Sequence, residues 1–218
     1  MSYPISMKQS RQRRRTIWRR FRAVAVLAAL AAGLLAPSAG SAAPAPGLED
    51  QGQRLDVAQG GLSPLSSLGR TYYEGEGVRQ DYAEALMWFR LAAEQGDADA
   101  ENYLGVMYQY GQGVEASALE AVRWYRLSAA RGNRYGQGNL GLMYAAGYGV
   151  ERDYSEAVRW FRRAAEQGYV LAQYNLGVAY ERGQGVRRDM GKAMAWYAEA
   201  CRNGFRQGCE AFRKLGGR

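Results

Sequence analysis

The sequence predicts an all-α solenoid made of four copies of a 36-residue helix pair, closed by a C-terminal capping helix. Three observations support this prediction. A Leu-Gly pair recurs every 36 residues, a Gly-x-Gly-Val segment follows each pair at a constant distance, and a Trp recurs in the second half of every copy. A fixed period of this length marks stacked supersecondary units, each of which buries its apolar face against its neighbours. The pairs are Leu68-Gly69, Leu104-Gly105, Leu140-Gly141 and Leu176-Gly177.

The chain begins with a segment that we expect to be a secretory signal peptide, residues 1–42. Residues 1–22 are polar and basic, residues 23–36 form an apolar run of 14, and small residues follow. A helix that crosses a bilayer needs about 20 apolar residues, so this run is short for an anchor. Small residues at positions 40 and 42 place cleavage after Ala42 and the mature protein in the periplasm or outside the cell. An uncleaved anchor stays open as the alternative, as does the choice between the Sec and twin-arginine export routes.

The boundaries of the remaining chain follow from the repeat. Residues 43–60 have no sustained apolar period, so we interpret them as a linker. The solenoid is predicted for residues 61–218. Its units are expected at about 61–96, 97–132, 133–168 and 169–204, followed by the cap at 205–218.

Each unit is predicted to contain two helices. The first helix carries Leu, Gly and Tyr at positions i, i+1 and i+4 and ends at a glycine, which can adopt the left-handed conformation of a helix C-terminus. The second helix starts at a residue whose side chain can cap it. Asp81, Ser117 and Asp153 each precede a Glu by three residues, whereas Asp189 precedes Lys192. Such caps contribute about 1 kcal/mol each.

The second helix also carries the recurring aromatic residues. We expect the four tryptophans and the Phe or Tyr that follows each of them to be core, with the Trp filling the groove opposite the glycine of the Leu-Gly pair. The arginines that follow three of these pairs are expected on a solvated outer face, paired with Glu94 or Glu166 four residues later. These residues are Trp88, Trp124, Trp160 and Trp196, with Arg90, Arg126 and Arg162.

Charge and composition exclude several classes of function. The chain has 29 basic and 21 acidic residues, but eight of the basic residues lie within residues 1–42, so the body of the protein is neutral. A protein that binds the phosphate backbone of a nucleic acid needs an excess of Lys and Arg on its folded domain. The neutral body of this protein therefore argues against nucleic-acid binding. The chain has no His and only two Cys, which excludes Ser-His-Asp and Cys-His catalysis and His-ligated metal sites. No metal or other cofactor is expected.

The pattern LGxxYxxGxGVxxDYxxAxxWFRxAAEQG resembles the Sel-1-like repeat, a relative of the tetratricopeptide repeat. The match covers residues 65–96, 101–132, 137–168 and 173–204. The resemblance implies a right-handed superhelix with a concave groove lined by the first helices. It also implies an adaptor or scaffold rather than an enzyme.

The two cysteines lie eight residues apart, on either side of the turn through Gly204. This turn folds the two flanking helices antiparallel, so the side chains can meet. Cysteine-rich secreted members of the family resemble this arrangement, with bridges across the same spacing, and the resemblance implies a disulfide between Cys201 and Cys209. Two reduced thiols are the alternative. A disulfide here would fasten an end unit that has only one neighbour.

A partner is expected on the concave face, where the first helix changes from copy to copy. The variable stripe runs at i, i+4 and i+7, and aromatic residues and Met are enriched where binding energy is concentrated. The residue before each Leu matches the tetratricopeptide position where Asn often binds a peptide backbone. Packing between repeats is the alternative role for this stripe. The candidate partner-binding residues are Tyr103, Met107, Tyr110, Asn139, Met143, Asn175 and Arg182.

We expect an exported adaptor that binds a protein or peptide of the bacterial cell envelope, as a monomer or with weak self-association. Cysteine-rich family members suggest an alternative, a protein that binds or hydrolyses cell-wall or β-lactam substrates. Against it, Ser-x-x-Lys does not occur in the repeat region, and no paired carboxylates stand out as an acid and base. A purely structural, self-associating protein is the third possibility, since the N-terminal first helix is less well protected than the C-terminal end.

Overall fold

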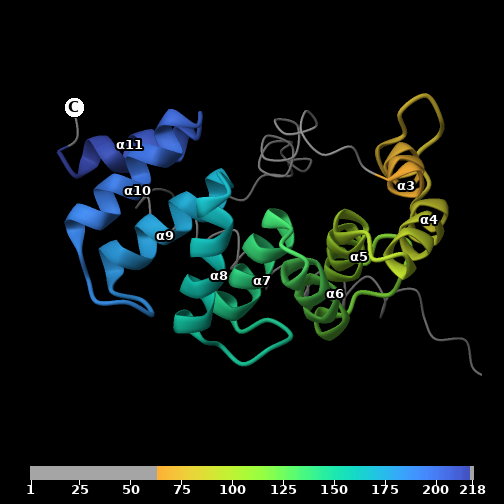
Figure 1. Ribbon diagram of the computed structural model, residues 1–218, viewed down its shortest axis with the longest axis horizontal. Coiled ribbons are helices and arrows are strands. Elements are labelled where there is room, and N and C mark those ends of the chain that lie inside the picture. The colour runs from red at the N-terminus through yellow and green to blue at the C-terminus, as the bar shows by residue number, and fades with distance from the viewer. Residues whose placement is uncertain (1–62, 217–218) are drawn as a thin grey trace, which may run out of the picture. The chain divides into compact units, whose positions relative to one another are not determined.

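The computed structural model describes residues 63–216, and Figure 1 shows their helices in chain order. The predicted signal peptide and linker, residues 1–60, lie outside the described residues. Within residues 63–216 there are nine α-helices and no strands. They are α3 (Pro64–Glu74), α4 (Tyr82–Glu94), α5 (Ala98–Tyr110), α6 (Ala118–Ala130), α7 (Arg134–Ala146), α8 (Tyr154–Glu166), α9 (Val170–Arg182), α10 (Met190–Arg202) and α11 (Arg206–Lys214). None of these helices is long and apolar enough to cross a membrane.

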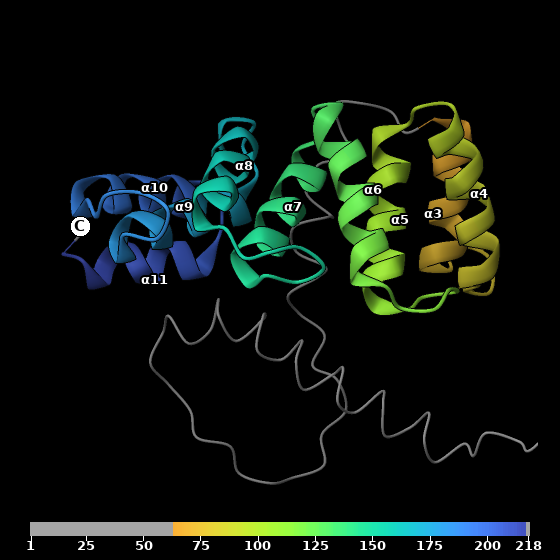
Figure 2. The same cartoon turned by 90° about the horizontal axis from the view of Figure 1, so that it is seen from below.

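The helices form four consecutive pairs and a final single helix, which confirms the predicted solenoid. The first helices are α3, α5, α7 and α9, the second helices are α4, α6, α8 and α10, and α11 stands in the position of a fifth first helix. Each helix packs mainly on the helices before and after it in the chain, and α5 also packs directly on α7. Figure 2 shows α3, α4, α5 and α6 side by side.

The predicted helix starts and ends are confirmed. The side chains of Asp81, Ser117, Asp153 and Asp189 accept hydrogen bonds from backbone N–H groups in the first turns of the second helices. Asp189 caps α10 through the N–H of Lys192 although it lacks the reciprocal Glu. The described first helices of the four units end at glycines with φ between 67° and 75°. Local signals in the sequence therefore determine where each second helix begins and where the first helices of the four units end.

The glycine of each Leu-Gly pair makes room for an aromatic ring of the same unit. A Cβ atom at Gly105 would lie 2.4 Å from Cε1 of Tyr125, and one at Gly141 would lie 2.6 Å from Cε1 of Phe161. The rings that fill these notches are almost completely buried: Phe89, Tyr125, Phe161 and Tyr197. The expectation that the tryptophan fills the notch is wrong, because the ring one residue later does so and the tryptophans are only half-buried.

Arginines of the second helices bind tyrosines of the next unit. Arg90 donates to the hydroxyl of Tyr108 at 2.8 Å, and Arg126 donates to that of Tyr144 at 3.0 Å. Arg162 repeats the bond to Tyr180 at 3.2 Å. The expected partners, Glu94 and Glu166, are not the ones that these guanidinium groups reach. The recurring Tyr therefore has a structural role, because it ties each unit to the one before it.

A disulfide joins Cys201 of α10 to Cys209 of α11, as the family resemblance implied. The two positions correspond in register to Ala165 and Gln173 of the preceding unit. There the amide Nε2 of Gln173 donates to the backbone carbonyl of Ala165 at 3.2 Å. At the C-terminal end a covalent bond thus takes the place of a hydrogen bond that connects helices inside the solenoid.

Candidate functional site

The candidate partner-binding residues lie on α5, α7 and α9, but the structure divides them between surface and core. Met107 is 0% exposed and Met143 is 3% exposed. The prediction that these two side chains meet a partner is wrong. They continue the buried stripe that contains Leu104 and Leu140, because positions i, i+4 and i+7 counted from Ala100 or Gly136 are all buried. This stripe packs on the second helix of the preceding unit, α4 for α5 and α6 for α7.

The two tyrosines of the predicted aromatic patch have different environments. The ring of Tyr103 is half-buried and stacks on that of Phe89, with 4.5 Å between ring centroids. Burial raises the pKa of its hydroxyl. Tyr103 is therefore largely a packing residue. Tyr110, the last residue of α5, is 46% exposed and remains a candidate for contact with a partner.

The polar candidates lie near the surface. The amide Nδ2 of Asn139 donates to Oδ1 of the buried Asn102 at 2.9 Å, which ties α7 to α5. Asn175 is half-buried on α9, and Arg182, the last residue of that helix, is exposed. Asn175 and Arg182 remain candidates, whereas Asn139 already makes a bond that holds two units together.

The stripe that is accessible on the first helices runs through i, i+3 and i+7 rather than i, i+4 and i+7. Its middle position is apolar and half-buried in three consecutive units, at Val106, Leu142 and Val178. Sequence reasoning missed these three residues. The signal that could have found them is the spacing of Ala100, Leu104 and Met107, which identifies the neighbouring stripe as core. We call the following set the first-helix face: Val106, Tyr110, Asn139, Leu142, Asn175, Val178 and Arg182.

A polar contact recurs between a side chain near the start of a first helix and a side chain after the end of the second helix of the same unit. Oε1 of Gln137 accepts from Nε2 of Gln167 at 2.8 Å, while its own amide donates to the carbonyl of Ala129 at 3.3 Å. In the preceding unit a glutamate, Glu101, takes the place of Gln137. Its Oε1 accepts from Nε of Arg131 at 3.0 Å, but its Oε2 is buried with no hydrogen-bond partner. Burial raises the pKa of Glu101, against the opposing effect of Arg131.

We predict that Glu101→Gln stabilises the protein by about 1 kcal/mol at pH 7, because it replaces the orphaned oxygen with a donor. Glu101 has a raised pKa when folded, so the native state binds more protons than the unfolded state as the pH falls toward the ordinary value of 4.5. The loss of folding stability caused by the buried Glu101 carboxylate therefore increases as the pH rises above about 4.5 and disappears below that pH. Urea midpoints measured at pH 4 and pH 7 check this prediction. The exposed Glu94→Gln is the matched control, and an equal gain from it would contradict the explanation.

The remaining acidic and hydroxyl groups are the ones that a metal site or a catalytic pair would use. Among residues 63–216 no group of three or more Cys, Asp or Glu is placed to hold a metal ion. The hydroxyls of Ser63 and Ser66 both donate to Oδ2 of Asp97, and the other carboxylate oxygen of Asp97 caps α5. This serine–carboxylate group is therefore a junction between units. The first-helix face has an apolar centre at Val106, Leu142 and Val178, with the amides of Asn139 and Asn175 beside it.

Comparison with known proteins agrees with the repeat. The family model for the Sel1 repeat matches four consecutive segments, residues 65–97, 98–133, 134–169 and 170–205. One similar solved structure is c5321, a protective antigen present in uropathogenic Escherichia coli strains and displaying an SLR fold. It shares 42% identity with a TM-score of 0.66, over 70% of this chain and 34% of that one. A Sel1 repeat protein from Oxalobacter formigenes shares 34% identity with a TM-score of 0.66, over 69% of this chain and 61% of that one.

This chain thus spans about a third of the length of the first relative and about three fifths of the second. No curated protein matches the chain.

Proposed function

Because the chain belongs to the Sel1 repeat family, we propose that it is a non-catalytic scaffold that binds a segment of a partner protein on the first-helix face. One observation carries the proposal: an apolar position stays partly exposed at the edge of the core in three consecutive units, at Val106, Leu142 and Val178. A solenoid needs to bury its apolar face only against its neighbours. The part of this apolar row that the solenoid's own packing leaves exposed is therefore available to another chain.

The polar residues of the first-helix face suit an extended polypeptide. Asn175 offers both a donor and an acceptor to a peptide backbone, and Tyr110 offers a rigid amphipathic ring. Arg182 adds a positive charge at one end of α9. The proposed partner is a protein or peptide, with the apolar row supplying affinity and the amides its orientation.

We place this scaffold in the bacterial cell envelope, in the periplasm or outside the cell. The disulfide between Cys201 and Cys209 supports this location, because disulfides persist in oxidising compartments. The basic and apolar pattern of residues 1–42 supports export. The related solved structures come from bacteria.

A photo-crosslinking amino acid at position 110 tests the proposal. In the full chain, expressed in its own source, we expect ultraviolet light to join position 110 to a partner protein. The same amino acid at position 119 is the control, because Leu119 is 69% exposed and belongs to a second helix, α6, rather than to a first helix. A crosslink from position 119 alone, or equal products from both positions, would contradict the proposed site.

Truncation of the apolar row gives the second measurement. We expect Val106→Ala with Leu142→Ala to reduce the crosslink at position 110 by about five-fold or more, since each removes methyl groups from the contact. Leu119→Ala with Leu127→Ala removes exposed apolar surface from the second helix α6 and should leave the crosslink unchanged. Circular dichroism confirms that both variants fold. An unchanged crosslink in the first variant would move the site away from the apolar row.

A further inference from the structure

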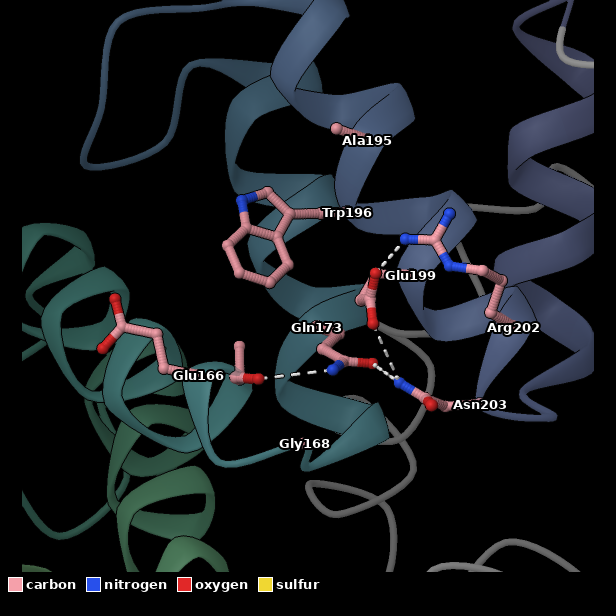
Figure 3. Close-up of a pocket in the computed structure, with 9 residues that line it drawn as sticks. Glu166, Gly168, Gln173, Ala195, Trp196, Glu199, Arg202 and Asn203 are labelled. Carbon is pink, nitrogen blue, oxygen red and sulfur yellow. Dashed lines mark hydrogen bonds and ion pairs between the residues drawn. The ribbon is translucent and has the colours of Figure 1, made fainter.

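A cleft of about 530 Å³ lies between the second helices α8 and α10, beside the first turns of α9. Its floor is made of paired amides. Nε2 of Gln173 donates to the carbonyl of Ala165 at 3.2 Å, and its Oε1 accepts from Nδ2 of Asn203 at 3.0 Å (Figure 3). Because these amide groups already bond to protein groups, a ligand would be bound by the side chains that form the walls of the cleft.

The walls of the cleft are aromatic and acidic. The indole of Trp196 projects from α10 toward α8, where Glu166 lies (Figure 3). Glu199 also lines the cleft but forms an ion pair with Arg202. Glu166 forms no ion pair or hydrogen bond with any residue between 63 and 216, since Arg162, four residues earlier, donates to Tyr180 instead. The cleft therefore has one uncompensated negative charge opposite an aromatic surface.

The preceding unit shows what this aromatic surface accepts. There the guanidinium of Arg163 lies over the ring of Trp160, 4.6 Å from its centroid. Three residues after Trp, where Arg163 stands, the fourth unit has Glu199. The described part of the chain places no cation over Trp196 and adds acidic groups beside it. The third unit therefore supplies its own cation, Arg163, to its tryptophan. The fourth unit has an acidic residue, Glu199, at the equivalent position.

We infer that this acid–aromatic cleft, defined by Trp196, Glu166 and Glu199, binds the guanidinium group of an arginine side chain from a partner protein. The planar cation stacks on the indole and its N–H groups face the carboxylate of Glu166, two interactions that reinforce each other in a partly desolvated cleft. Arginine fits better than lysine because its planar guanidinium can stack on the indole of Trp196 and donate hydrogen bonds to the carboxylate of Glu166 at the same time. The cleft lies between second helices, so it is a separate contact from the first-helix face and does not depend on the proposed function.

Nuclear magnetic resonance of the ¹⁵N-labelled full chain tests this site with the peptide acetyl-Gly-Arg-Gly-amide. We expect the indole N–H signal of Trp196 to shift and saturate at low-millimolar peptide. The same peptide with citrulline, which has the shape of arginine without its charge, should bind about ten-fold more weakly or worse, and the lysine peptide should fall between them. Equal binding of the citrulline peptide, or an unmoved Trp196 signal with the arginine peptide, would overturn the inference.

Three variants separate this site from general charge attraction. Glu166→Gln should weaken binding of the arginine peptide about five-fold or more. Glu94→Gln removes the same charge at the equivalent position two units earlier and should leave the affinity unchanged. Glu199→Arg should abolish binding, because it places a guanidinium of the chain over Trp196 as Arg163 does over Trp160. Equal effects of Glu166→Gln and Glu94→Gln, or native affinity in Glu199→Arg, would refute the cleft. Neither result bears on crosslinking from position 110.

Discussion

Gly149→Ala is expected to destabilise the solenoid by about 2–5 kcal/mol, roughly twice as much as the equivalent change Gly77→Ala. Both glycines belong to Gly-x-Gly-Val segments and have positive φ angles, 69° and 73°, so an alanine pays about 1–2 kcal/mol at either position. A Cβ atom at Gly149 would also lie 2.2 Å from the backbone oxygen of Ala118 in the preceding unit, whereas nothing lies within 4 Å at Gly77. The extra overlap costs about 1–3 kcal/mol more, because backbone must move.

Urea unfolding followed by circular dichroism at 222 nm measures both variants against the native chain. Gly77→Ala serves as the matched control, since it has the same backbone strain without a unit packed against it. Equal losses in the two variants would mean that this glycine is needed only for its φ angle. A larger loss at Gly149 would show that the loop is a contact between units.

Loss of the disulfide should release the C-terminal helix. Cys201→Ser with Cys209→Ser is expected to lower the local stability of α11 by roughly 2–3 kcal/mol on the loop-entropy model, because α11 has no second helix behind it among the described residues. Hydrogen exchange of backbone amides checks this result. We expect protection to fall in Arg206–Lys214 while α5 and α6 keep theirs.

The repeat itself supplies the control for this experiment. Cys201→Ala with Cys209→Gln rebuilds the pair that Ala165 and Gln173 form one unit earlier, where an amide donates to a carbonyl. This variant should recover about 0.5–1.5 kcal/mol of the protection that the serine variant loses. Full protection of α11 in the serine variant would show that packing on α10 is enough to hold the cap.

The helices could be predicted from the sequence because their signals are local. The aspartates and Ser117 that cap the second helices, and the glycines that end the first, act within a few residues of each other. The 36-residue period then repeats each assignment, so an error in one unit would have been visible in the others. The buried rings of Phe89 and Tyr125 also follow from the helical period.

The candidate site was less predictable, for a reason of geometry. Neighbouring positions of a helix, such as Val106 and Met107, point about 100° apart, and both are apolar. Only the packing of neighbouring helices on α5 decides that Met107 is buried in the core with Phe89 of α4, whereas Val106 is only partly buried. The same holds for Leu142 and Met143. Variation between copies was therefore no guide to exposure.

The amino-acid sequence by itself determined the period, the starts of the second helices, the ends of the first helices and the caps, because each depends on residues close together in the chain. The tertiary structure decided the rest. It left Val106 rather than Met107 partly exposed, gave Arg90 a tyrosine partner in the next unit, and formed the cleft that Glu166 and Trp196, 30 residues apart in sequence, both line. These features arise between helices, where the rotation of one helix against another sets which side chains meet.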